Sequence, residues 1–435
     1  MFKGILLLFM VWTCAALASG SKTASSSKPS CLIGGTTFNL QDYGAKGDGV
    51  TDDTQALERA WQDACKSPDA TLLIPGGKTF LIAQVSLQGP CKPNTKIRIE
   101  GNIHAPDASS WSNSNSAPWI QIKNLEGLKV EATGTLDGNG TSWWSRACKP
   151  TPGSTSCRKA PTSIEFNTVK NLRVNGLEVV NSPRMHVNFN GCQHVAAQWL
   201  RINSPGNSPN TDGIHITNSQ DVVIKYAMVA AGDDCVSIVG GSSNIDVSSI
   251  VCGPGHGISI GSLGGGDVVS GVRVRNANLI GTTNGVRIKS YKNGHGAVSD
   301  VSFEDVRMDE VANPIIIDQA YCDAHEHDCG AEAAAEEVSG VSISGVRYKN
   351  ISGTSKTKTA ITLRCSQVVG CDGIELDNVE ITQATKGANA DARCSNAYGV
   401  AGKNVFPESC LAAQELKSRR ASSSVQAEKV SLPFS

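Results

Sequence analysis

The sequence predicts an all-β fold, a single-stranded right-handed parallel β-helix with an N-terminal capping helix. A short alternation of apolar residues recurs every 22 residues, beginning at Ile214, Val236 and Ile258. A fixed period of this kind is typical of solenoids in which each coil contributes one strand to a face. The 435 residues include 44 glycines and only 5% are aromatic, which favours many short strands and turns over packed helices.

The first strand is predicted at residues 38–40, and a helix is predicted over about 53–66. Asp52 is suited to cap this helix, and Gln55 follows three residues later, as in a capping box. Apolar residues at helical spacing form one side of it: Ala56, Leu57, Ala60, Trp61 and Ala64. The terminal coil of a solenoid has open strand edges that need a cover, and we assign the helix to that role.

Strand and turn patterns then follow without interruption. Early strands are predicted at 72–74, 80–82, 97–99, 120–122, 128–130, 164–166 and 172–174. No helical pattern of ten or more residues separates them, so the connections are turns rather than the helices of βαβ units. Beyond Ile258 the core strands continue at Val286, Ile315 and Ile361, and the steps of 28, 29 and 46 residues indicate inserted loops.

The two ends of the chain differ from the β-helix predicted at residues 36–410. Residues 1–18 resemble a secretory signal peptide, in which Lys3 precedes an apolar run that ends in small residues. Residues 19–35 and 411–435 are polar, and both are predicted to be disordered. No other apolar run approaches the length of about 20 residues that spans a bilayer, so the sequence predicts a secreted protein without a membrane span.

Of the fifteen cysteines, one lies in the predicted signal peptide, and an even number in a secreted chain indicates disulfides. Proximity suggests the pairs Cys65–Cys91, Cys148–Cys157, Cys235–Cys252, Cys322–Cys329, Cys365–Cys371 and Cys394–Cys410. Cys31 and Cys192 are left, and Cys192 lies beside a predicted strand as a buried thiol would. Asn139 and Asn350 stand in N-glycosylation sequons within turn-like sequence.

Residues 210–256 hold three aspartates and a histidine in apolar, glycine-rich surroundings. Asp212, Asp234 and His256 follow one another in steps of 22 residues, which is the period of the coils. Equivalent positions on adjacent coils lie about 4.8 Å apart, so these side chains are predicted to be neighbours, with Asp233 pointing differently from Asp234. A single aspartate would be interpreted as an Asx turn. Carboxylates in register repel one another, and this arrangement is typical of acid/base catalysis.

Strand alternation places Asp212, Asp234 and His256 on the same side as the core residues that follow them. A buried stack of charges is very costly. We therefore predict that the chain bends at residues 213, 235 and 257, which turns these side chains outward.

Four motifs in this order resemble those of the polygalacturonases, family 28 of the glycoside hydrolases: Asn210-Thr211-Asp212, Gly232-Asp233-Asp234, Gly255-His256-Gly257 and Arg287-Ile288-Lys289. The resemblance covers about residues 38–410 and looks closest to the exo-acting plant branch. It implies the same β-helix and the hydrolysis of α-1,4 links between galacturonic acids in pectin. Taken alone, the register of Asp212 and Asp234 would suggest a retaining mechanism. The resemblance implies inversion instead, with Asp233 as acid and Asp212 and Asp234 as the base pair.

Arg287 and Lys289 alternate with core residues, so both are predicted to point outward from one face, about 7 Å apart. Such cations suit a galacturonate carboxylate, and the resemblance implies a substrate site there. Tyr291 keeps the same alternation and is predicted to stack on a sugar, while Asn210 is predicted to contact substrate or orient the neighbouring aspartate. His256 is predicted to position Asp233 and tune its proton.

A Ser/Asn-rich segment at residues 109–119 carries Trp111 and Trp119. One interpretation is a loop that borders the cleft and offers a tryptophan for stacking on sugar. The other is a surface loop held in place by packed tryptophans, and both stay open at this point.

The predicted partner is pectin or polygalacturonate, bound by a monomer in the extracellular cell wall. A formal net charge of −1 provides no overall field for a nucleic acid or a membrane surface. No metal or organic cofactor is implied, and no paired C-x-x-C arrangement indicates structural zinc. Exo action is favoured over endo action. A pectate lyase, which would need calcium, and a non-catalytic wall-binding protein on the same scaffold are the alternatives.

Overall fold

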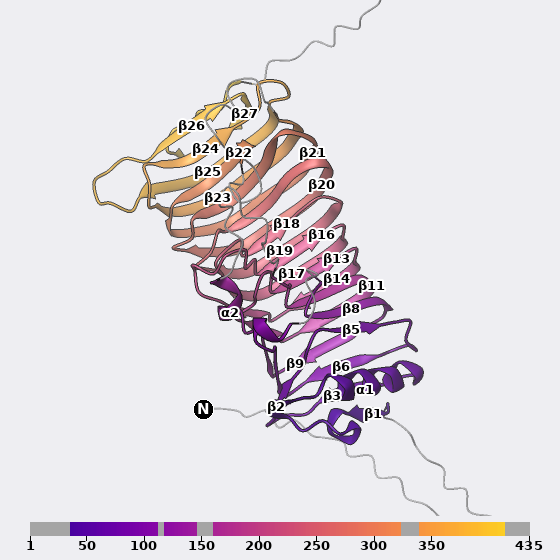
Figure 1. The fold of residues 1–435 in the computed structure, drawn as a ribbon. Coiled ribbons are helices and arrows are strands. Elements are labelled where there is room, and N and C mark those ends of the chain that lie inside the picture. The colour runs from indigo at the N-terminus through magenta and orange to yellow at the C-terminus, as the bar shows by residue number, and fades with distance from the viewer. Residues whose placement is uncertain (1–34, 112–116, 146–159, 323–338, 414–435) are drawn as a thin grey trace, which may run out of the picture. The chain divides into compact units, whose positions relative to one another are not determined.

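The computed structural model describes residues 35–111, 117–145, 160–322 and 339–413 (Figure 1). This part of the chain is a right-handed parallel β-helix, as predicted, and the pairings between its strands are parallel. The predicted signal peptide, nearly all of the predicted 19–35 segment and residues 414–435 of the predicted tail lie outside the described residues. Ala412 forms a bridge with Tyr398, so the ordered chain continues just past residue 410.

Each coil has three faces, which we call A, B and C in the order of the chain through the active-site coils. Face A contains β5 (Val85–Gln88), β8 (Ile120–Glu126), β11 (Ile164–Asn175), β13 (Val187–Asn190), β16 (Ile214–Thr217), β18 (Val236–Ile238), β20 (Ile258–Ile280), β21 (Asn284–Val311), β22 (Asn313–Tyr321), β24 (Thr359–Arg364) and β26 (Asp391–Ser395). Strand β11 turns a corner onto face B, and β20 and β21 continue onto faces B and C.

Face B contains β1 (Thr37–Asn39), β3 (Thr71–Ile74), β6 (Lys96–Ile99), β9 (Lys129–Ala132), β14 (Gln193–Gln198), β17 (Gln220–Ala230), β19 (Ser242–Cys252), β23 (Gly340–Ser355), β25 (Cys371–Gln383) and β27 (Ala397–Ala401). Face C contains β2 (Asp48–Asp52), β4 (Thr79–Leu81), β7 (Asn102–His104), β10 (Thr135–Asp137), β12 (Glu178–Val180), β15 (Arg201–Asn203) and β28 (Val405–Phe406). The later parts of β17, β19, β23 and β25 also lie on face C.

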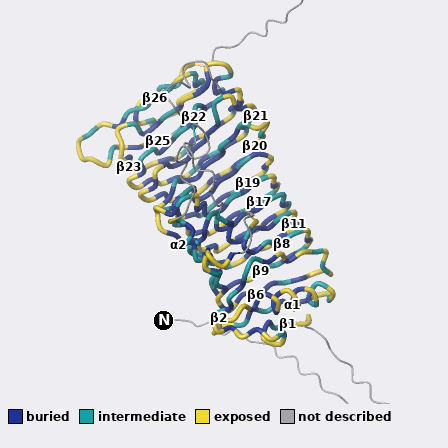
Figure 2. The backbone as a smooth tube through the Cα atoms, in the orientation of Figure 1, coloured by how far each residue is buried: buried dark blue, intermediate teal, exposed yellow. Residues whose placement is uncertain are grey.

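The predicted period is confirmed by the pairing of the strands on face A. Ile214 pairs with Val236, and Val236 pairs with Ile258. The same column continues through Val286, Ile315 and Ile361 across the longer steps. These β-branched side chains are fully buried, and Figure 2 shows how buried and exposed residues alternate along the coils. Alternation of this kind places one residue in two in the core and leaves the others on the outer surface.

The predicted N-terminal helix is α1 (Thr54–Lys66), and Trp61 is buried on its inner side. The prediction that Asp52 is its N-cap is wrong, because Asp52 ends β2 and the N-cap is Asp53. The Asp53 carboxylate instead accepts hydrogen bonds from the backbone of Lys46 and Gly47, which ties the preceding turn to the helix. The other helical elements described are short: η1 (Leu40–Tyr43), η2 (Ala108–Ser110) and α2 (Thr141–Trp144). None of these helices has the length and apolar character needed to cross a membrane.

Four predicted disulfides are present: Cys65–Cys91, Cys235–Cys252, Cys365–Cys371 and Cys394–Cys410. Cys192 is a buried free thiol, as predicted. Both cysteines of the predicted Cys148–Cys157 pair, and Cys329 and Cys31, lie outside the described residues. Burial raises the pKa of the Cys192 thiol to about 11, so this thiol is a packing group rather than a reactive one.

The structure decides between the two interpretations of the tryptophans near residue 111. Trp119 is fully buried, and its indole nitrogen donates to the carbonyl of Ile82 at 2.9 Å. Trp111 is also buried and packs edge-on against Trp143 at a centroid distance of 5.6 Å. The hypothesis that one of them stacks on a sugar is therefore wrong, because neither presents a ring face to solvent.

The two sequons lie at turns of the coil, and their glycosylation stays a prediction. Asn139 is half-buried, and its side-chain amide donates to the Ala105 carbonyl at 3.3 Å. Asn350 is exposed at a corner within β23, and its amide donates to the Asp305 carboxylate at 2.9 Å.

Candidate active site

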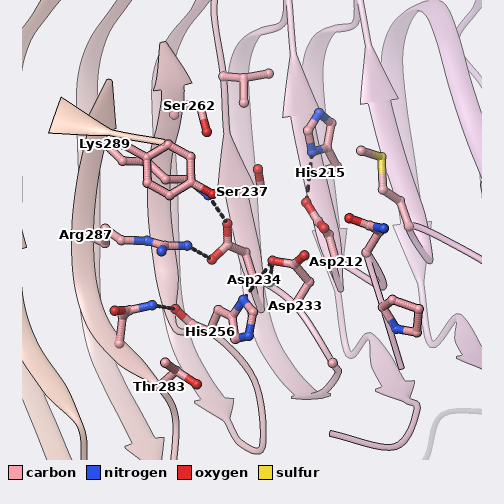
Figure 3. A pocket seen from close by; sticks show the side chains of 18 of the residues that line it. Asp212, His215, Asp233, Asp234, Ser237, His256, Ser262, Thr283, Arg287 and Lys289 are labelled. Atoms are coloured by element: carbon pink, nitrogen blue, oxygen red, sulfur yellow. Dashed lines mark hydrogen bonds and ion pairs between the residues drawn. The ribbon is translucent and has the colours of Figure 1, made fainter. Parts of the chain in front are cut away.

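A pocket of about 590 Å³ lies on the outer side of face A, where the chain arrives from face C (Figure 3). It brings together all eight catalytic and substrate-binding residues predicted from the sequence: Asn210, Asp212, Asp233, Asp234, His256, Arg287, Lys289 and Tyr291. The column of outward side chains beside it runs from β16 to β21 and contains His215, Ser237, Ser259 and Arg287. The pocket therefore lies between two features: the turns that lead into face A, which carry the aspartates and His256, and this column of outward side chains.

The predicted outward bend of the aspartates is present, because Asp212 contacts the outward-pointing His215 rather than the core. The backbone N–H of Gly213 donates to the carbonyl of Asp234 at 2.9 Å, so the two aspartates stand on adjacent coils as predicted. The turn is held from inside by Thr211, which is buried and whose hydroxyl accepts from the backbone N–H of Gly232 at 2.9 Å. A Cβ at Gly232 would collide with the Ser208 carbonyl, which explains the glycine before the paired aspartates.

Asp234 is the centre of a buried ionic network. One of its carboxylate oxygens accepts from Ser259 Oγ and Arg287 Nη2, both at 2.7 Å. The other accepts from Lys289 Nζ at 3.3 Å. Both cationic side chains are almost as buried as Asp234, so the charges compensate one another out of water.

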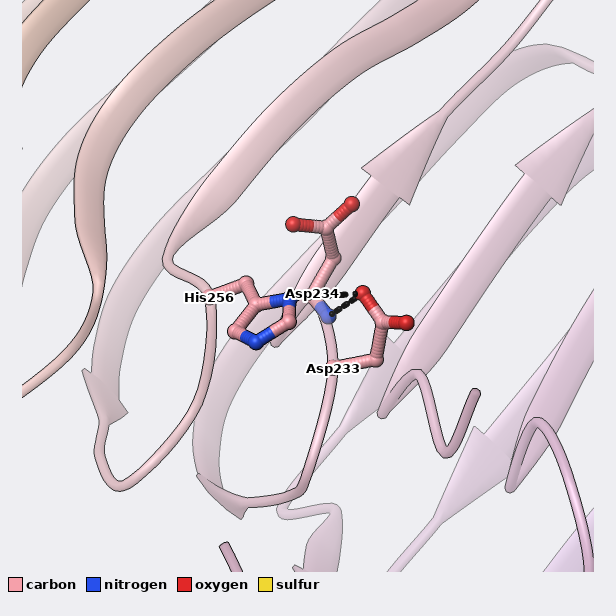
Figure 4. A group of neighbouring side chains, drawn as sticks. All are labelled: Asp233, Asp234 and His256. Atoms are coloured by element: carbon pink, nitrogen blue, oxygen red, sulfur yellow. Dashed lines mark hydrogen bonds and ion pairs between the residues drawn. The ribbon is translucent and has the colours of Figure 1, made fainter. Parts of the chain in front are cut away.

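Asp233 points away from Asp234 and contacts His256 instead (Figure 4). Its Oδ1 accepts from the backbone N–H of Asp234 at 2.8 Å and lies 3.0 Å from His256 Nδ1. The backbone N–H of His256 also donates to the carbonyl of Asp233 at 2.8 Å. Within the described part of the chain, Oδ2 has no hydrogen-bond partner, so this oxygen is available to a ligand in the pocket.

Several residues of the pocket were not singled out in the sequence. His215 Nδ1 lies 3.2 Å from Asp212 Oδ2, and Tyr321 places its ring 4.8 Å from Lys289 Nζ. The ring of the predicted residue Tyr291 lies 5.9 Å from that of Tyr321. Arg184 lines the pocket and makes no ion pair with any carboxylate that the structure describes. The coil period could have identified His215 and Ser259, because both occupy the column of Arg287.

Asp212, Asp233 and His256 have shifted pKa values with distinct causes. Burial raises the pKa of Asp212, and the negative charge of Asp233 raises it further. Burial also acts to raise the pKa of Asp233, but the hydrogen bond and charge of His256, aided by Lys289, outweigh it and lower that pKa below its usual value. The same contact raises the pKa of His256 above its usual value despite partial burial.

We expect activity and thermal stability to fall together on the alkaline side as His256 loses its proton. Since the folded-state pKa of His256 is raised, its stabilising contact with Asp233 is fully present below pH 6.5 and is lost as the pH rises through the raised pKa. His256→Gln, which does not titrate, should remove this pH-dependent step from the pH profiles of Tm and of kcat/KM. His194→Gln is the control, because His194 is an exposed histidine beside Asp221 outside the pocket, and its profiles should match the wild type.

Asp233, Asp234 and His256 also resemble a metal-ligand set, since donor atoms of the three lie within 4.8 Å of one another. Two observations make them a poor cation site. His256 Nδ1 is already directed at Asp233, and Asp234 is neutralised by Arg287 and Lys289. A further positive charge would be repelled by the two cations, so the donors fit acid/base chemistry better than metal binding.

Comparison with known proteins agrees with this geometry. The family model described as Glycosyl hydrolases family 28 matches residues 65–404. The chain is 43% identical over 377 residues to a polygalacturonase from Malus domestica, covering 86% of this chain and 78% of that protein. It is 42% identical over 365 residues to a polygalacturonase from Persea americana, covering 83% of this chain and 77% of that protein.

Solved structures with the same fold include enzymes of both action modes. An endo-xylogalacturonan hydrolase from Aspergillus tubingensis superposes with a TM-score of 0.72 at 25% identity, covering 85% of this chain and 99% of that one. An exopolygalacturonase from Thermotoga maritima superposes with a TM-score of 0.64 at 20% identity, covering 79% of this chain and 88% of that one. The second likeness concerns the fold alone.

Proposed function

The chain belongs to family 28 of the glycosyl hydrolases, and from this premise we propose that it is a secreted polygalacturonase that cleaves the α-1,4 links of polygalacturonate with inversion. The observation that carries the proposal is a pocket in which three carboxylates, two histidines and three cations face the same space. Glycoside hydrolysis needs one carboxylic acid to protonate the leaving oxygen and one carboxylate to activate water. The cations suit a substrate that carries one carboxylate per sugar.

We assign the general acid to Asp233. Its Oδ2 is open to the pocket, while Oδ1 is held by His256 and by the backbone of Asp234. A fixed carboxyl with one free oxygen can deliver a proton to a defined place. His256 then acts as a positioning residue, because it holds the carboxyl and does not itself face the leaving oxygen.

The lowered pKa of Asp233 runs against this role, but a bound substrate would raise it. His256 contributes most of the lowering, and the positive charge of Lys289 contributes a further part. A galacturonate carboxylate bound near Lys289 would cancel that charge, and the sugar would exclude water from Asp233. Both changes raise the pKa of a carboxyl group, so we expect Asp233 to be protonated when the substrate is bound.

We assign the base to Asp212, supported by Asp234. Both oxygens of Asp234 are engaged by Ser259, Arg287 and Lys289. Asp212 has one oxygen near His215 and one without a hydrogen-bond partner among the described residues. A raised pKa makes its carboxylate a stronger base toward water. Asp234 then fixes the cations and borders the water site.

Arg184 is proposed as the anchor for a substrate carboxylate, because Arg287 and Lys289 already share Asp234. Arg184→Gln should raise KM for de-esterified polygalacturonate by about tenfold, the worth of one charge-assisted hydrogen bond, with kcat nearly unchanged. Arg98→Gln is a matched control, since Arg98 is an exposed arginine near Glu131 on face B. An equal KM for Arg184→Gln and the wild type would remove Arg184 from the substrate site.

Inversion gives a direct stereochemical prediction. Proton NMR recorded in the first moments of hydrolysis should show the β-anomer of the new reducing end, because water attacks the face opposite the leaving oxygen. The α-anomer as first product would mean a covalent intermediate and would contradict the assigned roles of Asp212 and Asp233. Mutarotation equilibrates the anomers later, so only the initial spectrum counts.

Exo action is the finer proposal, on the resemblance of the sequence to exo-acting plant members. Digests sampled early should then contain monomer and long polymer, whereas endo action would produce mixed oligomers. Extracellular location is likewise proposed, and the four disulfides support it because such bonds persist in oxidising compartments. Binding as a monomer to pectin in the cell wall belongs to the same proposal.

A further inference from the structure

An exposed pair of aromatic rings stands at the corner between faces B and C. Trp199 lies in the turn between β14 and β15, and Tyr226 occupies the equivalent position of the next coil within β17. Their rings stack at a centroid distance of 4.5 Å and an angle of 16°. Trp199 is 53% exposed and Tyr226 is 45% exposed, although rings of this size are usually buried.

The backbone at this corner is one that large side chains avoid. Trp199 and Tyr226 have φ angles of 59° and 55°, in the left-handed region. The preceding coil has Gly176 at this position, and the two following coils have Ser249 and Asn276. Two aromatic residues at a position suited to glycine and asparagine are costly for the fold, which indicates a use for the exposed rings.

About half of each aromatic residue is exposed, and the neighbouring coils place small residues at this corner. Gly176 occupies it in the coil next to Trp199, and Ser249 occupies it in the coil next to Tyr226. The C–H face of a pyranose ring packs on an aromatic face of this kind, where it removes apolar surface from water. The stack is therefore suited to a sugar chain that passes along the corner.

A hollow of about 280 Å³ lies on face C, and two of its lining residues, Arg201 and Met228, follow Trp199 and Tyr226 by two positions in the chain. Its rim includes Met228, which is 60% exposed, and Arg201, whose guanidinium lies 3.7 Å from Glu178. Lys225, immediately before Tyr226, is exposed on the other side of the stack. The rings thus have a cation on each side, and one of these cations, Lys225, makes no ion pair within the described chain.

We propose that Trp199 and Tyr226, with Lys225 and Arg201, form a second binding site for an acidic polysaccharide chain, outside the catalytic pocket. Stacking holds the sugar rings, and the two cations select chains that carry carboxylates. The site stands on the same coils as Asp212 and Asp233, one face away around the coil, so it would keep the enzyme on its polymer between cleavages. The acidic nature of the chain rests on the proposed function, whereas the stacking site itself does not.

The test is the double variant Trp199→Asn/Tyr226→Asn. Asparagine is well tolerated in the left-handed region, so Tm should be equal to or above that of the wild type. In an Asp233→Asn background that prevents cleavage, the change should weaken binding to polygalacturonate by about tenfold, measured by affinity gel electrophoresis. With Asp233 present, kcat and KM on trigalacturonate should stay within about twofold. Val268→Asn, an equally exposed apolar residue at 53%, is the control.

Several outcomes would overturn the proposal. Unchanged affinity for polygalacturonate in the double variant would do so, and so would an equal loss of activity on trigalacturonate, which would place the effect in the catalytic pocket. If the double variant lost as much affinity for fully methyl-esterified pectin as for polygalacturonate, the site would not select an acidic chain. A dimer in sedimentation that the double variant makes monomeric, with polysaccharide affinity unchanged, would mean a self-association surface.

The two proposals fail separately. A wild-type protein that binds polygalacturonate through Trp199 but releases no reducing ends would refute the proposed hydrolase and support the second site. If the protein hydrolyses polygalacturonate, and the wild type and the double variant bind the polymer equally well, the hydrolase is supported and the second site is refuted.

Discussion

Asp233→Asn should lower kcat on polygalacturonate by about 10²–10⁴-fold, the range expected for the loss of a general acid. The amide keeps the shape of the side chain and can still accept from the backbone N–H of Asp234 through its oxygen. Tm should therefore fall no further than it does in the wild type when His256 loses its proton, because only the charge of the contact with His256 is removed. The measurement is the initial rate of reducing-end formation, with Tm from calorimetry on the same samples.

A substrate with a good leaving group separates the acid from the base. An oligogalacturonide with an aryl group at its reducing end needs little protonation to depart, so Asp233→Asn should recover most of the wild-type rate on it. Asp212→Asn should stay slow on both substrates, because water activation is still missing. If Asp212→Asn recovers and Asp233→Asn does not, the two roles are exchanged, as the raised pKa of Asp212 and the lowered pKa of Asp233 would suggest by themselves.

Asp234→Ala should abolish activity and destabilise the fold by about 3–5 kcal/mol, because it leaves Arg287 and Lys289 buried without their counter-charge. Calorimetry and guanidinium denaturation measure the loss of stability. Adding Arg287→Met to Asp234→Ala should recover part of the stability and none of the activity. Recovery of both would mean that the network serves the fold alone.

Asp391, a carboxylate at the surface that also lies near one lysine and one arginine, is the control for this network. Asp391 also lies within 4 Å of two cations, at 3.9 Å from Lys358 and 3.5 Å from Arg393, but these side chains are exposed. Asp391→Ala should leave Tm and activity close to the wild type, since water screens such pairs. A large loss of stability in this variant would show that the coil is sensitive to any aspartate removed from its surface.

The fold was predictable because each coil of a solenoid places its core residues at nearly the same spacing in the sequence. The step of 22 residues placed Ile214, Val236 and Ile258 in one column, and the pairings follow it. Alternation also placed Arg287 and Lys289 on the outer side. Such patterns depend only on local periodicity, which the sequence carries directly.

Contacts between side chains were less accessible. The sequence could not show that both cations engage Asp234, because this depends on side-chain rotamers. The predicted contact of His256 with Asp233 is present. The N-cap of α1 was misplaced by one residue, because Asp52 and Asp53 are equally suited to cap and only the neighbouring turn distinguishes them. Trp199 stands in a corner whose exposure no alternation predicts.

The central claim is that the pocket hydrolyses polygalacturonate through its own carboxylates, without a metal. The most direct measurement is digestion of de-esterified polygalacturonate with and without EDTA, following reducing ends and the ultraviolet absorbance of unsaturated products together. We expect reducing ends without absorbance, at a rate that EDTA leaves unchanged. Absorbance that disappears with EDTA would mean a calcium-dependent lyase, and a folded protein that releases no product would mean a wall-binding protein; either result would contradict the claim.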